Sequence, residues 1–124
     1  MTIPRLAVPL GLLAVPRAVL HDLDLVHEGT AVNAALVFVP LLIWILVAVL
    51  RAGNPFLTLL AAGGVYGVCL AVVHNVFWSP APGAGELLLR VAMTVSSLFT
   101  GVAVGALCGV IAWGLARVPR RRAP

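Results

Sequence analysis

The sequence contains little charge, and it has no lysine or glutamine at all. Charged residues make up 10% of its 124 residues, whereas 62% are hydrophobic. A soluble domain is about 25% charged, because it needs a polar surface to face water, so the shortage excludes a soluble enzyme and a disordered chain. Only 2 cysteines are present, which also excludes a disulfide-framed secreted domain. A mean hydropathy of +1.13 instead indicates a small polytopic membrane protein.

Positive charges outnumber negative ones, with eight arginines and four acids. A net charge of +4 and a pI near 10.6 would suit nucleic acid. However, the charges lie at the ends of the apolar segments, where membrane topology explains them, so we expect no nucleic-acid partner. Arginine without lysine is typical of a GC-rich bacterial genome, and we therefore expect a multi-pass protein of the bacterial inner (cytoplasmic) membrane.

Four apolar segments predict an all-α membrane protein, a small bundle of four transmembrane helices in one domain, residues 1–124. About 20 apolar residues are needed for one helical crossing. The link between the second and third segments contains Asn54, a good N-cap, and Pro55, which suits the first helical position. Prolines after Trp78 stop the third helix. The expected spans are residues 3–20, 30–50, 56–78 and 91–116.

The first segment has a second interpretation. It contains Arg5, Arg17 and three prolines, and its place at the N-terminus is that of a cleaved signal peptide. A cleavage site of small residues is expected after such a stretch, but Pro16, Arg17 and Ala18 stand there instead. We therefore expect a retained first span.

The distribution of charge predicts the orientation. With four spans and both termini in the cytoplasm, six of the eight arginines fall on the inner side, as the positive-inside rule favours, and all four acids fall on the outer side. Arg17 and Arg90 lie near outer span ends, where their side chains can reach the headgroups. The last arginines are a topology anchor that also contacts anionic lipid headgroups. The inner set is Arg5, Arg51, Arg117, Arg120, Arg121 and Arg122.

Small residues recur every four positions in the last span. Such a stripe lets another backbone approach closely in lipid. The third span has a similar stripe, and the two stripes leave two alternatives open: pairing within one chain, or pairing with a second copy or another membrane protein. Cys69 and Cys108 lie at different depths, so we expect no disulfide between them. The packing residues are Ser97, Gly101, Gly105 and Gly109, with Gly63 and Gly67 in the third span.

Polar residues gather at the outer ends of the spans. If the first helix continues through the next loop, His21, Asp24 and Glu28 share one face at spacings i, i+3 and i+7. The third span brings His74 to the same depth. An ionisable residue inside a span is costly and therefore suggests a function.

Three interpretations of this cluster stay open. In the first, His74 bonds a loop carboxylate such as Asp24 or Glu28, which ties the first and third spans together as a structural cap. In the second, two imidazoles and two carboxylates bind zinc or iron, with two-histidine haem ligation as a variant. In the third, a histidine–carboxylate pair handles protons or substrate at the mouth of a pathway. The metal-ligand candidates are His21, Asp24, Glu28 and His74, with His27 as a substitute for His21.

No known catalytic motif occurs in the chain, so we expect no enzyme and no catalytic residue. The expected function is a helix-packing subunit or accessory of a homo-oligomer or a larger membrane assembly. Two alternatives remain, a small transporter or channel with an outer histidine–carboxylate vestibule, and a metal- or haem-binding protein. Apart from that last alternative, no cofactor is expected.

Overall fold

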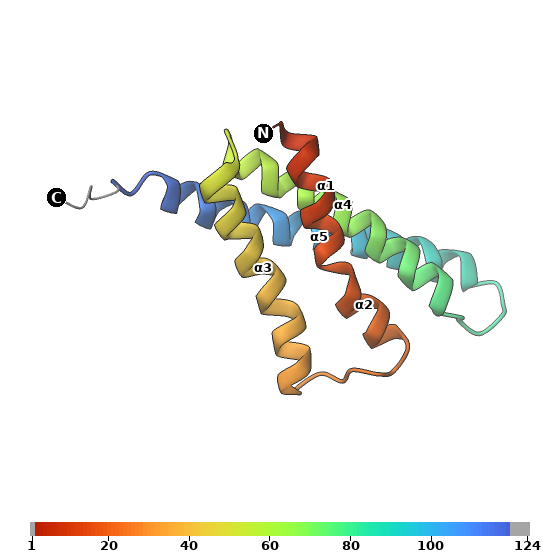
Figure 1. The fold of residues 1–124 in the computed structure, drawn as a ribbon. Coiled ribbons are helices and arrows are strands. Elements are labelled where there is room, and N and C mark those ends of the chain that lie inside the picture. Colours follow the sequence, from red (N-terminus) through yellow and green to blue (C-terminus); the bar gives the residue numbers. More distant parts are fainter. Residues whose placement is uncertain (1, 120–124) are drawn as a thin grey trace.

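The computed structural model describes residues 2–119, and within them the regular structure is entirely α-helical. Four stretches are long and apolar enough to cross a membrane, which confirms the expected helical spans. Their ends lie within two residues of expectation, except that α5 starts at Glu86 rather than at residue 91. The helices are α1 (Ile3–Leu13), α2 (Val15–Asp22), α3 (Ala31–Arg51), α4 (Pro55–Phe77) and α5 (Glu86–Ala116) (Figure 1).

The starts of α3 and α4 follow from local sequence. The Thr30 hydroxyl accepts a hydrogen bond from the Asn33 amide, and the Asn54 side chain accepts one from the Leu57 amide. Both satisfy amides that a helix start leaves without partners. Pro55 occupies the first turn of α4, where its missing N–H costs nothing. The predicted Asn54 cap is therefore confirmed.

The first span is two helices rather than one, because it breaks at Ala14. Pro16 has no N–H to donate to the preceding turn, and the Ala14 amide turns back to the Gly11 carbonyl. At this break the Leu10 carbonyl accepts a hydrogen bond of 2.6 Å from Nε1 of Trp44. Trp44 is fully buried and meets Tyr66 edge to face. A side chain of α3 thus caps the end of α1.

The helices α4 and α5 pack most closely and lie side by side along their length (Figure 1). A Cβ atom added at Gly63 or Gly101 would overlap the backbone of the facing helix, and one added at Gly105 would meet the Gly63 Cα at 2.8 Å. Gly67 faces Leu98 in the same way. The small-residue stripes of the two helices are therefore used against each other within one chain. Ser97 is buried, and Gly109 lies beside Phe56.

The helix α3 is held mainly at its C-terminal half. Its buried residues are Pro40, Trp44 and Ala48, which join the core that α1, α4 and α5 build around Leu10, Leu59 and Ala112. Towards Ala31 it runs away from the α4–α5 pair, and the loop after α2 crosses the gap to reach its start (Figure 1).

Candidate functional site

Polar side chains collect at one end of the bundle, where α2 and α4 end and α3 and α5 begin. We call this end the polar edge. It carries all four acids of the chain and the three histidines. Its members are Arg17, His21, Asp22, Asp24, His27, Glu28, Asn33, His74, Asn75, Glu86, Arg90 and Thr94.

The best-buried contact of the polar edge joins α2 to α4. His74 Nδ1 lies 2.5 Å from Asp22 Oδ2, and because a carboxylate only accepts, the ring N–H is the donor. The Asp22 side chain is 11% exposed and that of His74 28%. A carboxylate at the end of the first span therefore bonds His74, as the first interpretation of the cluster held, but it is Asp22 and neither of the two examples named, Asp24 and Glu28.

The geometry of the loop explains this difference. The first helix ends at Asp22 instead of continuing, and Asp24 has a φ of 60°, which turns the chain out of the helix. Consequently, His21, Asp24 and Glu28 do not share a helical face. A signal for Asp22 was present, because it follows Ala18 by four residues and so lies on the same face. Ala18 is buried beside Leu70 of α4.

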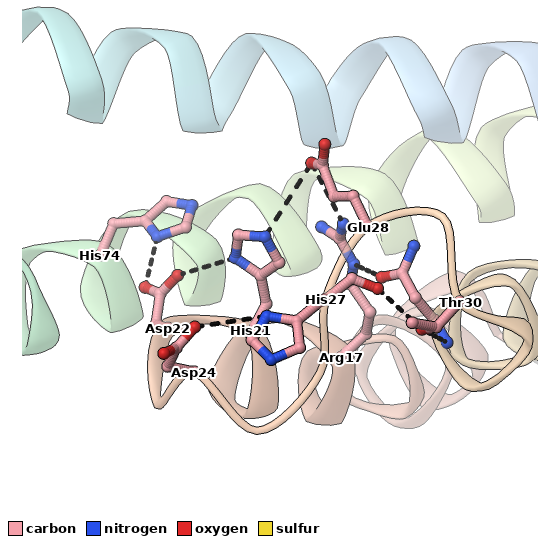
Figure 2. Close-up of polar contacts among 9 residues, drawn as sticks. Arg17, His21, Asp22, Asp24, His27, Glu28, Thr30 and His74 are labelled. Carbon is pink, nitrogen blue, oxygen red and sulfur yellow. Dashed lines mark hydrogen bonds and ion pairs between the residues drawn. The ribbon is translucent and has the colours of Figure 1, made fainter.

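From Asp22 the contacts continue towards α3. His21 Nδ1 lies 3.6 Å from Asp22 Oδ1, and His21 Nε2 lies 3.9 Å from Glu28 Oε1. The same Glu28 oxygen is 3.9 Å from Nη2 of Arg17, whose Nε donates to Asn33 Oδ1 at 3.0 Å. We call this series the polar chain (Figure 2). In order along the edge, its members are His74, Asp22, His21, Glu28, Arg17 and Asn33.

The remaining loop pair stands apart from the polar chain. His27 Nδ1 lies 3.4 Å from Asp24 Oδ1, with both side chains mostly exposed at 66% and 90%. The backbone carbonyl of His27 accepts a hydrogen bond from the Thr30 hydroxyl (Figure 2). This pair belongs to the local turn before α3.

A second polar group of the polar edge joins α4 to α5. The Asn75 side-chain amide donates to Thr94 Oγ1 at 3.0 Å, and Arg90 Nη1 donates to the Asn75 carbonyl at 3.3 Å. Arg90 Nε also donates to Glu86 Oε1 at 3.2 Å. Glu86 and Arg90 are an i,i+4 pair in the first turns of α5. These turns precede residue 91, where the span was predicted to begin.

The four expected metal ligands do not meet at one point. Within residues 2–119, no group of three or more His, Cys, Asp or Glu side chains is placed to hold a metal ion. His74 bonds Asp22, His21 lies between Asp22 and Glu28, and Asp24 faces His27. A zinc ion needs ligand atoms about 2.0–2.3 Å away from one centre.

Cavities adjoin the polar chain on both sides. One of about 390 Å³ lies at its α4 end, lined by His21, Asp22, His74, Phe77, Trp78 and Met93. Arg17 and Leu36 line two more cavities, of about 290 and 460 Å³. The larger lies between the first span and α3. The smaller is also lined by Tyr66 of α4 and by Thr100 and Val104 of α5. We call this pair of cavities the α2–α3 cleft.

The C-terminal arginines fall partly outside the described residues. Arg117 lies over the ring of Trp113, with its Cζ 3.5 Å from the ring centroid, a cation–π contact. Arg120, Arg121 and Arg122 lie beyond residue 119. Both cysteines, Cys69 and Cys108, are free thiols, as the sequence predicted.

Comparisons with protein-family models, with curated proteins and with solved structures yield no match for this chain.

Proposed function

We propose that the protein is a non-enzymatic accessory of a bacterial inner-membrane assembly, with both termini in the cytoplasm, and that it holds a membrane component in the α2–α3 cleft. One observation carries this proposal. On the N-terminal side of Pro40, α3 lies outside the core, and the Arg17–Asn33 hydrogen bond spans the resulting gap. The gap has a volume typical of a ligand site, which is about 300–1,000 Å³.

The glycine stripe favoured a packing subunit when only the sequence was considered. In the fold, the stripe faces α4 of the same chain, so a partner in a homo-oligomer or larger assembly needs another surface. The α2–α3 cleft is separate from the stripe, and it is the place where we propose that a membrane component binds, because its larger cavity lies open between the first span and α3.

The test fills the cleft with a side chain of the protein itself. Leu36 lines both cavities of the cleft, so Leu36→Trp should occupy it. Leu42→Trp is the matched control, since Leu42 is on the same helix and exposed. The melting temperature is measured in phosphatidylcholine nanodiscs with rising fractions of a total lipid extract from bacterial inner membranes.

A ligand that binds only the folded state raises its stability with concentration. We expect the extract to raise the melting temperature of the parent and of the control variant Leu42→Trp. The melting temperature of Leu36→Trp should stay the same at every fraction of extract. A parent protein that melts at the same temperature at every fraction would contradict the proposal. So would a Leu36→Trp variant that follows the parent.

A small transporter or channel is the second candidate, favoured by the cavity at the His74 end of the polar chain. Its lining combines His21, Asp22 and His74 with an apolar wall, a composition suited to handling protons or polar solutes. Proton and ion flux into proteoliposomes tests it. Flux that is lost in His74→Ala and kept in His27→Ala supports this candidate, and a parent protein without flux excludes it.

A further inference from the structure

Among residues 2–119, Arg17 is the only charged residue that lines the α2–α3 cleft. It lies five residues before the end of α2, which is about 7–8 Å along the helix axis from that end. If the first span crosses the membrane, this depth lies just inside the boundary between hydrocarbon and headgroups. An arginine there needs anionic or polar partners.

The partners of Arg17 leave much of its guanidinium free. Its five N–H donors include one at Nε, which Asn33 engages at 3.0 Å and so orients the group. The carboxylate in ion-pair range is Glu28, whose Oε1 lies 3.9 Å from Nη2. That distance is longer than a hydrogen bond.

Glu28 is also a loosely placed counter-ion. Its side chain is 78% exposed, and its loop contains two left-handed residues, Asp24 with a φ of 60° and Gly29 with a φ of 80°. A water-exposed ion pair at this separation contributes little to stability. A better anion can therefore displace Glu28 from Arg17 at small cost.

Apart from Arg17, the larger cavity of the cleft is lined by apolar residues, whereas the smaller one is also lined by Tyr66 and Thr100. The larger cavity, of about 460 Å³, runs between the first span and the outer half of α3, and Val32 and Val39 on its wall are exposed. In a bilayer such an opening faces lipid chains. Besides Arg17, the lining is Leu13, Pro16, Val32, Ala35, Leu36, Val39 and Pro40.

From one oriented cation beside an apolar trough that opens to the bilayer, we infer that the α2–α3 cleft binds an anionic phospholipid. The lipid phosphate takes the place of Glu28 on the Arg17 guanidinium, and an acyl chain lies along the trough against Leu36. Arginine suits this role because its planar fork matches phosphate oxygens in pairs. This inference rests on the proposed function, and it names the ligand of the same cleft.

A free phosphate ion and a partner helix fit the site less well. A phosphate ion would leave the apolar trough unfilled, and a helix would bring no anion for Arg17 unless it carried an acid within the membrane. A phospholipid supplies both groups in one molecule at the correct depth. The acyl chains of neutral lipids fit the same trough, so the charge of Arg17 should decide the preference for anionic over neutral lipids.

The experiment compares two lipids with identical chains, dioleoyl-phosphatidylglycerol and dioleoyl-phosphatidylcholine. Native mass spectrometry of the full chain released from detergent counts bound lipid during a titration with each. Both lipids offer a phosphate to Arg17, but the quaternary ammonium of phosphatidylcholine places a second cation near the guanidinium. We therefore expect one phosphatidylglycerol to bind at about tenfold lower concentration than phosphatidylcholine. Arg17→Gln should abolish this preference. Arg90→Gln should retain it, because Arg90 is a second arginine of the polar edge, is paired to Glu86 and lies outside the cleft.

A gain-of-affinity variant protects the test against a failure of Arg17→Gln to fold. Glu28→Gln removes the competing carboxylate, and we expect it to tighten phosphatidylglycerol binding by about three- to fivefold, which corresponds to less than 1 kcal/mol. Glu86→Gln is its control and should leave the affinity unchanged.

Several outcomes would overturn the inference. They are equal binding of the two lipids, equal loss of preference in Arg17→Gln and Arg90→Gln, no gain in Glu28→Gln, and displacement of the lipid by inorganic phosphate alone. If the lipid extract stabilises the parent but not Leu36→Trp while phosphatidylglycerol shows no preference, the cleft is a site for another ligand and only the lipid assignment fails. If no lipid affects stability or binds, both proposals fail.

Discussion

The imidazole of His74 donates to the carboxylate of Asp22 at 2.5 Å, across 52 positions of the chain and between two helices. This contact fixes the end of α2 on the end of α4. Asp22 also links His74 to the rest of the polar chain, because its other oxygen faces His21 at 3.6 Å. The polar end of the first span is therefore held on α4 by a hydrogen bond as well as by apolar packing.

A double-mutant cycle measures the coupling free energy between Asp22 and His74. We expect Asp22→Ala and His74→Ala to show a coupling free energy of about 0.6–1.7 kcal/mol, the average-to-maximum range that double-mutant cycles give for polar contacts between membrane helices. The same cycle on Asp24 and His27 should give a coupling near zero, because that pair is exposed and water screens it. Unfolding free energies in mixed micelles provide the measurement, and similar coupling in both cycles would contradict the assigned roles.

The close approach of α4 and α5 gives a prediction about adjacent glycines. A Cβ atom at Gly63 would overlap the backbone around Gly101, whereas one at Gly64 meets nothing within 4 Å. Gly63→Ala should therefore destabilise the fold by about 1–3 kcal/mol, the usual cost of overpacking, and Gly64→Ala should be neutral. Gly105→Leu should prevent α4 and α5 from packing. If Gly63→Ala and Gly64→Ala melt alike, α4 and α5 do not pack through this stripe.

Trp44 gives a prediction for the break in the first span. Its indole N–H satisfies the Leu10 carbonyl at the end of α1, and Trp44→Phe keeps a large apolar ring but leaves that buried acceptor without its donor. We expect a loss of about 1–3 kcal/mol in the free energy of unfolding. Trp113→Phe serves as the comparison, since Trp113 is exposed on α5. Equal melting temperatures for the two variants would show that the Trp44 hydrogen bond contributes nothing.

Metal binding gives a prediction by elemental analysis. Because the candidate ligands His21, Asp24, Glu28 and His74 are divided among separate contacts, we expect no stoichiometric zinc or iron. The untagged protein is dialysed against a mild chelator and measured by plasma mass spectrometry. About one metal ion per chain that disappears in His74→Ala would overturn this expectation and favour the metal-binding alternative.

Much of the fold could be predicted from the sequence, because apolar length and helix caps are local properties. The spans and the Asn54 cap are examples. The break at Ala14 was not predicted, since three prolines in one segment do not by themselves indicate where a helix is interrupted. The early start of α5 depends on the Glu86–Arg90 pair and on the Asn75 carbonyl of a neighbouring helix.

The candidate site could be predicted only in part. The sequence placed His74 at the polar edge, but its partner depends on a backbone turn at Asp24, and no periodicity encodes that turn. The α2–α3 cleft was not predicted at all. Its width depends on the angle at which α3 leaves the core, and a uniformly apolar helix such as α3 does not specify that angle in its sequence.

Photocrosslinking in living cells identifies the occupant of the cleft. Benzoylphenylalanine is placed at Leu36, which lines the cleft, and in a second variant at Leu42, which is exposed on the same helix. If the cleft holds an anionic phospholipid, the adducts at Leu36 will be enriched in that class, and those at Leu42 will reflect the bulk membrane. Identical lipid adducts at the two positions, or a protein adduct at Leu36, would contradict the assignment of the cleft to an anionic lipid.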